Sequence, residues 1–254
     1  MAKNVLVILQ ARMGSTRFPG KVMSLLNGVP LIEFQLKRIK KSNRVTNIVV
    51  AISDDSTDDR LATFLSQKKQ VFVRGSLDNV LARFLKVIEL YNPEIVVRIT
   101  GDCPLVMPEM IDELVDMLKT SNADYATNAI SGSYPDGLDV EVFYSRLLIQ
   151  VDGLPLTSAE REHVTLGIYT RPEVFRILSI DSPLNLNELR LTVDYPEDLA
   201  FLEGILKCSE KENTDLTLTD ILSILSAHPE LTSKVSHTMR NIAIRDWKST
   251  ANES

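Results

Sequence analysis

The chain has 254 residues, 44% of them hydrophobic, and a formal net charge of −6, so it can bury a substantial core but is too acidic for a general nucleic-acid-binding protein. The two cysteines, Cys103 and Cys208, lie far apart without metal-ligand spacing, which is typical of a reducing compartment rather than of a disulfide framework. No secretion signal precedes the first apolar run and no run is long enough to cross a membrane, so we expect a cytoplasmic protein without a membrane partner.

Apolar runs and helical patterns alternate through the first half of the chain. Strands are predicted at residues 5–9, 48–52, 71–73 and 95–99, and helices between them at 31–39, 57–66 and 80–90. A further helix begins at Pro108, because proline suits the first turn of a helix. The alternation predicts βαβ units and therefore a mostly parallel sheet.

The pattern changes after about residue 124. Further strands are predicted at 125–128, 138–143, 175–180 and 189–193, with a helical stretch at 157–169 and a helix opening at Pro196. A polar segment follows Glu210, and two short helices are expected at 218–225 and 229–235 before an end that frays from Lys248. We therefore divide the chain into a main domain, residues 1–206, and a small helical C-terminal extension, residues 207–254.

The segment after the first strand combines glycine with positive charge. Within ten residues it contains Gly14, Gly20, the hydroxyl residues Ser15 and Thr16, and the cations Arg12, Arg17 and Lys21. Glycine lets backbone N–H groups approach an anion closely, and three cations together indicate a polyphosphate. The spacing matches neither a P-loop nor the GxGxxG fingerprint of dinucleotide-binding proteins. The alternative is a solvent-exposed basic turn.

Two aspartates are predicted at the same edge of the sheet as this loop. Asp102 follows the strand at 95–99, and Asp194 follows the strand at 189–193. Because ligands bind beyond the carboxyl ends of the strands in open α/β sheets, both carboxylates are expected to face the phosphate site. Two carboxylates beside a polyphosphate suit Mg²⁺. The alternative is that each aspartate only caps its local turn or helix.

Two more segments carry charged residues that could face this site. A turn at Pro135-Asp136-Gly137 precedes Asp139 and Glu141, which alternate with valines and so share one strand face. That face either lines the cleft, where its acids would bind sugar hydroxyls or metal-bound water, or belongs to a solvent-facing edge strand. Glu162 and His163 lie in the predicted helical stretch, where a single histidine is more often structural than catalytic.

Six segments in the same order resemble a known enzyme family. They are ILQARMGSTRFPGKV, VRGSLDNVLARF, RITGDCPLV, PDGLDVEVF, EREHVT and RLTVDYPEDLAFL, and they span about residues 4–205. The chain thereby resembles the cytidylyltransferases of the spore coat polysaccharide biosynthesis F type, which are relatives of the CMP-Kdo and CMP-sialic acid synthetases. The resemblance implies a Rossmann-like nucleotide-diphospho-sugar transferase fold, with helices on both faces of a mostly parallel sheet and with residues 1–206 as the nucleotidyltransferase domain.

The resemblance also implies the reaction and a set of site residues. CMP would pass from CTP to an acidic sugar or a related acceptor with release of pyrophosphate, with Mg²⁺ as cofactor and a homodimer as the assembly. Catalytic roles are predicted for Arg12, Lys21, Asp102 and Asp194, of which the two aspartates would bind the metal. Nucleotide contacts are predicted for Gly14, Ser15, Thr16, Arg17, Arg74, Gly75 and Ser76, and acceptor contacts for Asp136, Asp139, Glu141, Glu162 and His163.

Two other functions are compatible with these residues. A glycosyltransferase of the same general architecture would consume a nucleotide-sugar, but such enzymes usually carry an Asp-x-Asp metal pair, whereas Asp102 is followed by Cys103 and Pro104. A non-catalytic nucleotide-binding relative would keep the fold without the reaction. The residues identify neither the acceptor nor the base, so the preference for CTP rests on the resemblance alone.

Overall fold

The computed structural model of the protein describes residues 4–209 and 213–234. Its strands are β1 (Val5–Gln10), β2 (Leu25–Leu26), β3 (Val29–Pro30), β4 (Asn47–Ser53), β5 (Phe72–Gly75), β6 (Ile95–Thr100), β7 (Tyr125–Thr127), β8 (Glu141–Tyr144) and β9 (Ile177–Ser179). Its α-helices are α1 (Leu31–Ile39), α2 (Asp59–Gln67), α3 (Val80–Tyr91), α4 (Pro108–Thr120), α5 (Arg146–Asp152), α6 (Ser158–Glu162), α7 (Leu166–Tyr169), α8 (Pro196–Lys207) and α9 (Leu218–Ala227). Short 3₁₀ helices are η1 (Lys21–Met23), η2 (Ser56–Asp58), η3 (Asn213–Asp215) and η4 (Pro229–Lys234).

One mixed sheet carries most of these strands. In the described residues seven strands follow the order β5-β4-β1-β6-β8-β7-β9, and β2 pairs with β3 in a separate small hairpin. Strands β5, β4, β1 and β6 are mutually parallel, whereas β8 runs antiparallel to both of its neighbours, β6 and β7. The prediction of a mostly parallel sheet is therefore confirmed. The chain winds outward from β1 in both directions, and the crevice at such a reversal point is where open α/β sheets bind ligands.

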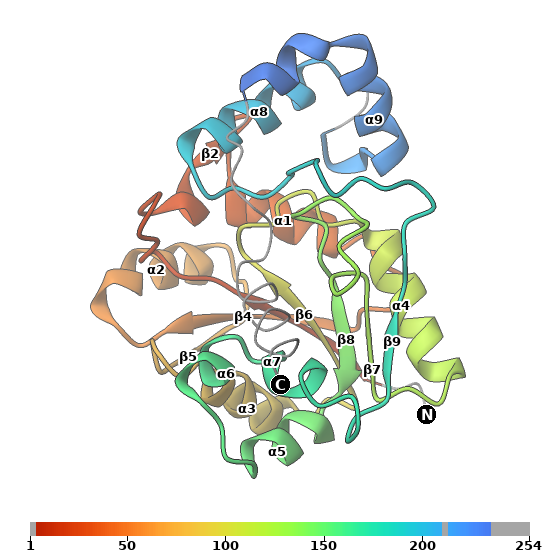
Figure 1. Ribbon diagram of the computed structural model, residues 1–254. Helices are drawn as coiled ribbons and strands as arrows, with labels where there is room; N and C mark the ends of the chain where they lie inside the picture. The colour runs from red at the N-terminus through yellow and green to blue at the C-terminus, as the bar shows by residue number, and fades with distance from the viewer. Residues whose placement is uncertain (1–3, 210–212, 235–254) are drawn as a thin grey trace.

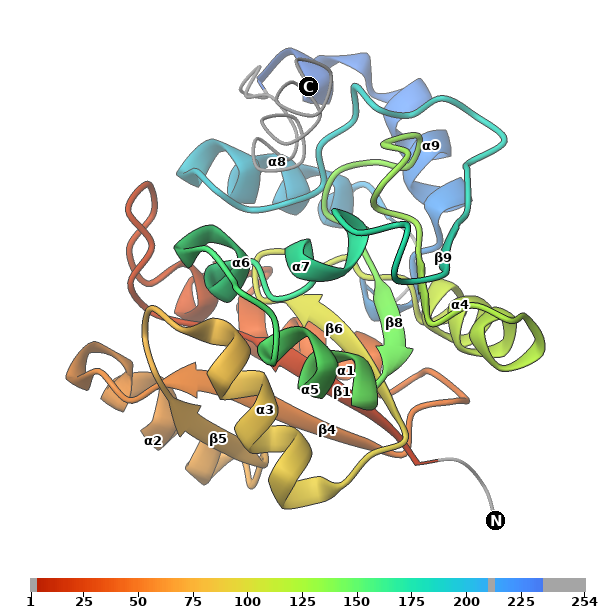
Figure 2. The ribbon, with the colours of Figure 1, turned by 60° about the horizontal axis from the view of Figure 1, so that its bottom comes forward.

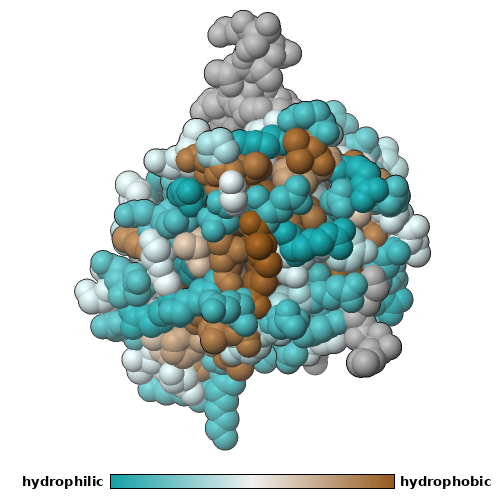
Figure 3. All heavy atoms as spheres, turned by 90° about the horizontal axis from the view of Figure 1, so that it is seen from below, coloured by the Kyte–Doolittle hydropathy of each residue, from teal (hydrophilic) through white to brown (hydrophobic). Residues whose placement is uncertain are grey.

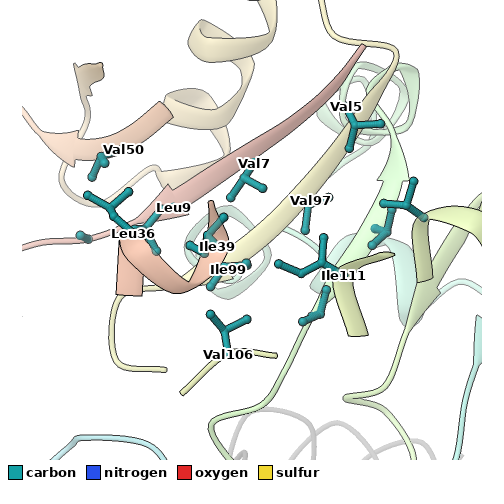
Figure 4. Packing of buried hydrophobic residues seen from close by; sticks show 14 of the residues in the cluster. Val5, Val7, Leu9, Leu36, Ile39, Val50, Val97, Ile99, Val106 and Ile111 are labelled. Carbon is teal, nitrogen blue, oxygen red and sulfur yellow. The ribbon is translucent and has the colours of Figure 1, made fainter. Parts of the chain in front are cut away.

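Helices cover both faces of the sheet, as predicted (Figure 1). Helices α1, α2 and α4 pack on one face, while α3, α5 and α7 pack on the other, where Figure 2 shows α3 and α5 in front of the strands. Strand β1 divides its side chains between the two layers, because successive residues of a strand point to opposite faces. Figure 4 shows Val5, Val7 and Leu9 of β1 on the side of α1 and α4, and Leu6 and Ile8 join the opposite cluster.

Three predicted elements differ from the structure. The helical stretch at 157–169 is interrupted between α6 and α7, because Val164 has a φ of 47°, which no α-helix accommodates. Residues 189–193 form no ladder and make only a single bridge, Asp136–Arg190. The helix expected at 229–235 is the 3₁₀ helix η4, which ends at Lys234. Val235 and the fraying expected from Lys248 lie outside the described residues.

The described part of the C-terminal extension packs against the main domain. Leu216 and Ile221 belong to a buried cluster with side chains of α8 and of the loop after β6, and Figure 1 shows α8 and α9 together at one end of the molecule. Arg38 of α1 donates a hydrogen bond of 2.8 Å to the carbonyl of Leu216. Thr217 caps α9, because its hydroxyl accepts from the N–H of Asp220 at 3.2 Å.

The outer face of the α3–α5 layer is mostly hydrophilic, with a hydrophobic strip near its middle (Figure 3). On this layer Leu90 of α3 and Ile149 of α5 are 62% and 60% exposed. Within the described residues no helix combines the length and the apolar character that a membrane crossing needs.

Gly137 is required by a close approach of two chain segments. Its φ is 100°, and a Cβ atom on it would lie 2.4 Å from the carbonyl carbon of Leu191 and 2.4 Å from the nitrogen of Thr192. We expect Gly137→Ala to lower the free energy of unfolding by about 3 kcal/mol or more, since a strained φ and a backbone clash add together. The measurement is equilibrium unfolding in urea.

Gly132 provides the matched control for this prediction. It also has a positive φ, 75°, but nothing lies within 4 Å of an added Cβ. Gly132→Ala should therefore cost only the backbone strain, about 1 to 2 kcal/mol. Equal losses in the two variants would show that the contact with residues 191 and 192 is unimportant.

Candidate active site

The loop after β1 is held in a closed shape by hydrogen bonds around Met13. The carbonyl of Met13 accepts from the N–H groups of Ser15 and Gly20 at 2.9 and 2.8 Å, and its own N–H donates to buried Asp58 at 2.6 Å. Gly20 has a φ of 75°, in the left-handed region that favours glycine. The loop therefore returns to the edge of the sheet and places Lys21 at the start of η1.

Lys21 joins the two predicted aspartates. Its Nζ lies 3.1 Å from Oδ2 of Asp102 and 3.0 Å from Oδ1 of Asp194, and the side chain is largely buried. Arg17 Nη2 lies 3.0 Å from the same oxygen of Asp194, and its guanidinium carbon lies 5.2 Å from the centroid of the Tyr195 ring. The structure thus brings the basic loop and both aspartates to one edge of the sheet.

Backbone contacts set the spacing of the two aspartates. The N–H of Val193 donates to the carbonyl of Asp102 at 2.8 Å, and the hydroxyl of Thr192 donates to the same carbonyl at 3.1 Å. The N–H of Gly101 donates to the carbonyl of Gln10 at 2.7 Å, which ties the turn after β6 to the end of β1. The two carboxylates are therefore fixed to the same rim although 92 positions separate them in the sequence.

Asp194 does not cap α8. Asp198, in the first turn of that helix, accepts the backbone N–H groups of Asp194 and Tyr195 at 2.8 and 3.0 Å. These donors are therefore satisfied by Asp198, and the Asp194 carboxylate instead contacts the cations Lys21, Arg17 and Arg190. The alternative that Asp194 serves as the helix cap is wrong.

Burial and pairing act in opposite directions on the charged groups here. Burial alone would lower the pKa of Lys21, but the neighbouring Asp102 and Asp194 raise it above its ordinary value. Burial would raise the pKa of Asp102, but the ammonium of Lys21 lowers it below 3.8. Burial, followed by the charge of Asp102, raises the pKa of Cys103 well above its ordinary value. At neutral pH the lysine and the aspartate are ionised, and Cys103 is a thiol unsuited to act as a nucleophile.

Glu141 lies inside the sheet. Strand β8 pairs with β6 on one side and with β7 on the other, so the alternative of a solvent-facing edge strand is wrong. The buried Glu141 carboxylate forms an ion pair with Arg98 and accepts hydrogen bonds from the hydroxyls of Tyr125 and Thr165. All four side chains line the same cavity as Lys21. This carboxylate is therefore engaged by its neighbours within the lining of the cavity.

Glu162 and His163 reach the cavity at the break between α6 and α7. The turn at Val164 is closed by a hydrogen bond from the N–H of Thr165 to the carbonyl of His163. Burial lowers the pKa of His163 below 6.5, so its imidazole is largely neutral at pH 7. Glu162 lies 3.9 Å from Arg12, a contact that joins α6 to the loop after β1.

The remaining predicted residues divide into two groups. Asp136 and Asp139 line the cavity, and Asp136 accepts a hydrogen bond of 2.9 Å from Arg190. The segment 74–76 does not line it. Arg74 donates to Asp59 and to the carbonyls of Ser53 and Asp55. Gly75 and Ser76 contact Arg83, which does line the cavity: a Cβ on Gly75 would lie 3.2 Å from its side chain, and the carbonyl of Ser76 accepts from its guanidinium.

The loop after β1, the turn after β6, the segment before α8 and the α6–α7 region line a cavity of about 1350 Å³. Single-ligand pockets usually measure about 300 to 1000 Å³, so this one has room for a nucleotide and a second substrate. Of the predicted site residues, those that line it are Arg12, Ser15, Thr16, Arg17, Lys21, Asp102, Asp136, Asp139, Glu141, Glu162, His163 and Asp194. Gly14 and the segment 74–76 are not among them.

Two carboxylates in this cavity suit a divalent cation. Asp102 and Asp194 already share one positive group, the ammonium of Lys21, and their hard oxygen atoms are the donors that Mg²⁺ prefers. Among residues 4–209 and 213–234, no group of three or more His, Cys, Asp or Glu side chains is arranged to hold a metal ion. A metal at this point would therefore need phosphate or water oxygens to complete its shell, which is how Mg²⁺ is usually bound.

Several residues that build the site were not predicted from the sequence, among them Asp58 and Arg190. Asp58 holds the loop after β1, but it lies in an acidic run that gives no sign of a partner 45 positions away. Arg190 contacts Asp136, Asp194 and Asp198. A single charged residue in the predicted strand at 189–193 was the signal that could have identified Arg190.

The chain is similar to known proteins over most of its length. A sequence model of the family described as cytidylyltransferase matches residues 6–217. The spore coat polysaccharide biosynthesis protein SpsF of Bacillus subtilis is 35% identical over 235 residues, which are 89% of this chain and 96% of that protein. A solved cytidylyltransferase from Leptospira borgpetersenii is 28% identical with a TM-score of 0.86, over 92% of this chain and 98% of the other.

A second solved structure shares the fold at lower identity. It is CMP:2-keto-3-deoxy-manno-octonic acid synthetase complexed with CTP, with 16% identity and a TM-score of 0.63 over 81% of this chain and 99% of the other. Fold, site geometry and sequence similarity over most of the length lead to one conclusion. The chain is an enzyme of the cytidylyltransferase family.

Proposed function

We propose that this cytidylyltransferase transfers CMP from CTP to a hydroxyl group of an acidic sugar, with Mg²⁺ as cofactor and pyrophosphate as the second product. The observation that carries the proposal is the convergence of Lys21, Asp102 and Asp194 on one cavity, with Nζ within 3.1 Å of both carboxylates. Transfer of a nucleotidyl group needs little covalent chemistry from the protein. It needs cations for the phosphates and a fixed position for the attacking oxygen.

The loop after β1 supports binding of the triphosphate. Arg12, Arg17 and Lys21 line the cavity within ten residues of one another, together with Ser15 and Thr16. In this assignment Arg12 and Arg17 would bind the leaving phosphates, and Lys21 would exchange one of its carboxylate contacts for a phosphate oxygen. Each charged hydrogen bond of this kind contributes about 1.5 to 3 kcal/mol.

Asp102 and Asp194 would hold the metal ion. When bound, Mg²⁺ would offset negative charge at the α-phosphate and orient the attacking oxygen. Both residues are already held in place, because the carbonyl of Asp102 accepts from the N–H of Val193 and the N–H of Asp194 donates to the carboxylate of Asp198. Little reorganisation is therefore needed. Lys21 lies between the two carboxylates and limits their mutual repulsion in the absence of the ion.

The acceptor would occupy the part of the cavity formed by α6, α7 and the start of β8. Hydrogen-bonding groups that could contact a polyol are present among the lining residues here, namely Thr157, Glu162, His163 and Arg171. The acidic nature of the acceptor is supported by the synthetase of similar fold, whose substrate is 2-keto-3-deoxy-manno-octonic acid. The neutral imidazole of His163 can accept or donate one hydrogen bond at this point.

The test is a screen for pyrophosphate release with four nucleoside triphosphates and a panel of acidic sugars, with and without EDTA. We expect release only with CTP, one or a few acids, and Mg²⁺. Release of a nucleoside diphosphate from a nucleotide-sugar would instead indicate a glycosyltransferase. Binding of CTP without pyrophosphate release across the panel would indicate a non-catalytic relative.

The other partners and the cell compartment stay predictions. A homodimer is expected from the resemblance, and sedimentation of the purified protein would test it. Fractionation of the source cells would test the expected cytoplasmic location. The roles of Gly14 and of Arg74, Gly75 and Ser76 in nucleotide binding also stay predictions, since these residues do not line the cavity.

A further inference from the structure

Arg190 is a buried cation at the edge of the proposed active site. It lies four residues before Asp194, is 7% exposed, and belongs to the extended segment that bridges to Asp136. The segment is held there by backbone bonds from Asp136 N–H to Leu189 and from Leu191 N–H to Asp136. The position of its guanidinium is therefore set by two parts of the chain that are more than 50 positions apart.

The guanidinium contacts three carboxylates at once. Nη1 lies 2.9 Å from Oδ2 of Asp136, and Nη2 lies 3.3 Å from Oδ2 of Asp198 and 3.5 Å from Oδ2 of Asp194. Asp198 in turn accepts the backbone N–H of Asp194. Arg190 therefore joins Asp198 in the first turn of α8, Asp136 in the loop after β7, and the proposed metal-binding carboxylate of Asp194.

The two oxygens of Asp194 consequently face different groups. Oδ2 is directed toward Arg190, whereas Oδ1 is directed toward Lys21 and Arg17. A carboxylate that is held at one oxygen cannot rotate freely about its terminal bond. The oxygen that faces the cavity is thus presented in one orientation.

We propose that Arg190 is a positioning residue for this enzyme: by holding Oδ2 of Asp194 it directs Oδ1 toward the metal ion and the nucleotide. This inference rests on the proposed function, because it assigns Asp194 to the metal. A planar guanidinium can bind several carboxylates in fixed directions, which a lysine ammonium cannot reproduce. Loss of such supporting contacts typically costs about 10- to 100-fold in metal affinity.

The experiment measures metal coupling without turnover. CTP binding is determined by calorimetry in Mg²⁺ and in EDTA, with no acceptor present. The coupling ratio is the dissociation constant in EDTA divided by the dissociation constant in Mg²⁺. For wild type we expect tighter binding in Mg²⁺. For Arg190→Lys we expect this ratio to fall about 10-fold or more, while the dissociation constant in EDTA stays unchanged.

Arg38→Lys is the matched control for loss of a buried arginine. Arg38 is also buried, but it donates to the carbonyls of Val106 and Leu216 and contacts none of the three aspartates that Arg190 contacts. The Arg38→Lys substitution should lower the melting temperature without changing the coupling ratio. An equal loss of coupling in Arg38→Lys at a similar melting temperature would show that Arg190 acts only through general stability.

Asp136→Asn is the second variant, in case Arg190→Lys does not fold. It removes the charge that anchors Nη1 of Arg190, so a smaller fall of the coupling ratio is expected even without an acceptor. Wild-type coupling in both Asp136→Asn and Arg190→Lys would overturn the inference and leave the proposed function intact. Absence of any Mg²⁺ effect in wild type would overturn the metal assignment itself.

Discussion

Asp102→Asn is expected to lower the turnover of CTP by about 10³-fold while the fold is retained. The substitution keeps the size of the side chain and removes one negative charge from the pair that would hold Mg²⁺. The metal supplies several kcal/mol of stabilisation to the developing charge, and about 1.4 kcal/mol corresponds to a tenfold change in rate. Lys21 keeps its contact with Asp194 in this variant, so the protein should still fold, although the free energy of unfolding falls by the contribution of the lost ion pair with Asp102. The measurement is steady-state pyrophosphate release at increasing Mg²⁺.

Asp116→Asn controls for the loss of an aspartate as such. Asp116 lies on α4 and pairs with Arg44 at 2.8 Å, and it does not line the cavity. Its turnover should equal that of wild type. Turnover of Asp102→Asn within a few-fold of wild type at every Mg²⁺ concentration would remove Asp102 from the metal site.

The sheet was predictable because its central strands are buried on both faces. Residues 5–9 and 48–52 are continuous apolar runs, and residues 95–99 are apolar except for Arg98, which is typical of parallel strands between two helical layers. The strands at the far end of the sheet are short, and their bounds were less accurate. The strand predicted at 138–143 is observed as β8 at 141–144. It begins three residues later than predicted because the chain still turns after Gly137.

The convergence of the site was predictable from topology. The loop after β1 and Asp102 after β6 follow adjacent parallel strands, so they must lie at the same rim. Asp194 reached that rim by another route. Its segment forms no ladder and is held by two hydrogen bonds to Asp102 and two backbone hydrogen bonds with Asp136, so strand order alone does not explain its position at the rim.

Contacts that depend on side chains far apart in sequence were not predictable. Nothing local indicates that Arg98 and Tyr125 would engage Glu141, or that Asp58 would hold the backbone of Met13. The left-handed Val164 was also invisible, because a β-branched residue rarely adopts a positive φ and helical periodicity continues across it. Such conformations persist only where the surrounding structure enforces them.

Lys21→Met is the second variant with a large expected effect. Lys21 is the cation that joins Asp102 to Asp194, and in the proposed function it also contacts the triphosphate. Loss of a charged hydrogen bond to phosphate costs about 1.5 to 3 kcal/mol, so kcat/KM for CTP should fall roughly 10- to 100-fold. The measurement is pyrophosphate release with CTP varied at saturating Mg²⁺. Lys37→Ala, which removes an exposed lysine paired with Glu33 on α1, should leave it unchanged.

The same variant has a pH-dependent stability that identifies Lys21 as the partner of the aspartates. In wild type, burial alone would raise the pKa of Asp102, but Lys21 lowers it below 3.8. A carboxylate with a lowered pKa in the folded state stabilises the fold fully above its unfolded pKa and loses that contribution as the pH falls through the folded pKa. In Lys21→Met the two carboxylates repel each other, so their protonation relieves this repulsion instead.

The difference in free energy of unfolding between wild type and Lys21→Met should therefore be largest near pH 7 and shrink below about pH 4 in urea titrations. A difference that stays constant from pH 7 to pH 3 would mean that Lys21 stabilises the fold by packing alone, and that the ion pairs with Asp102 and Asp194 contribute nothing to it.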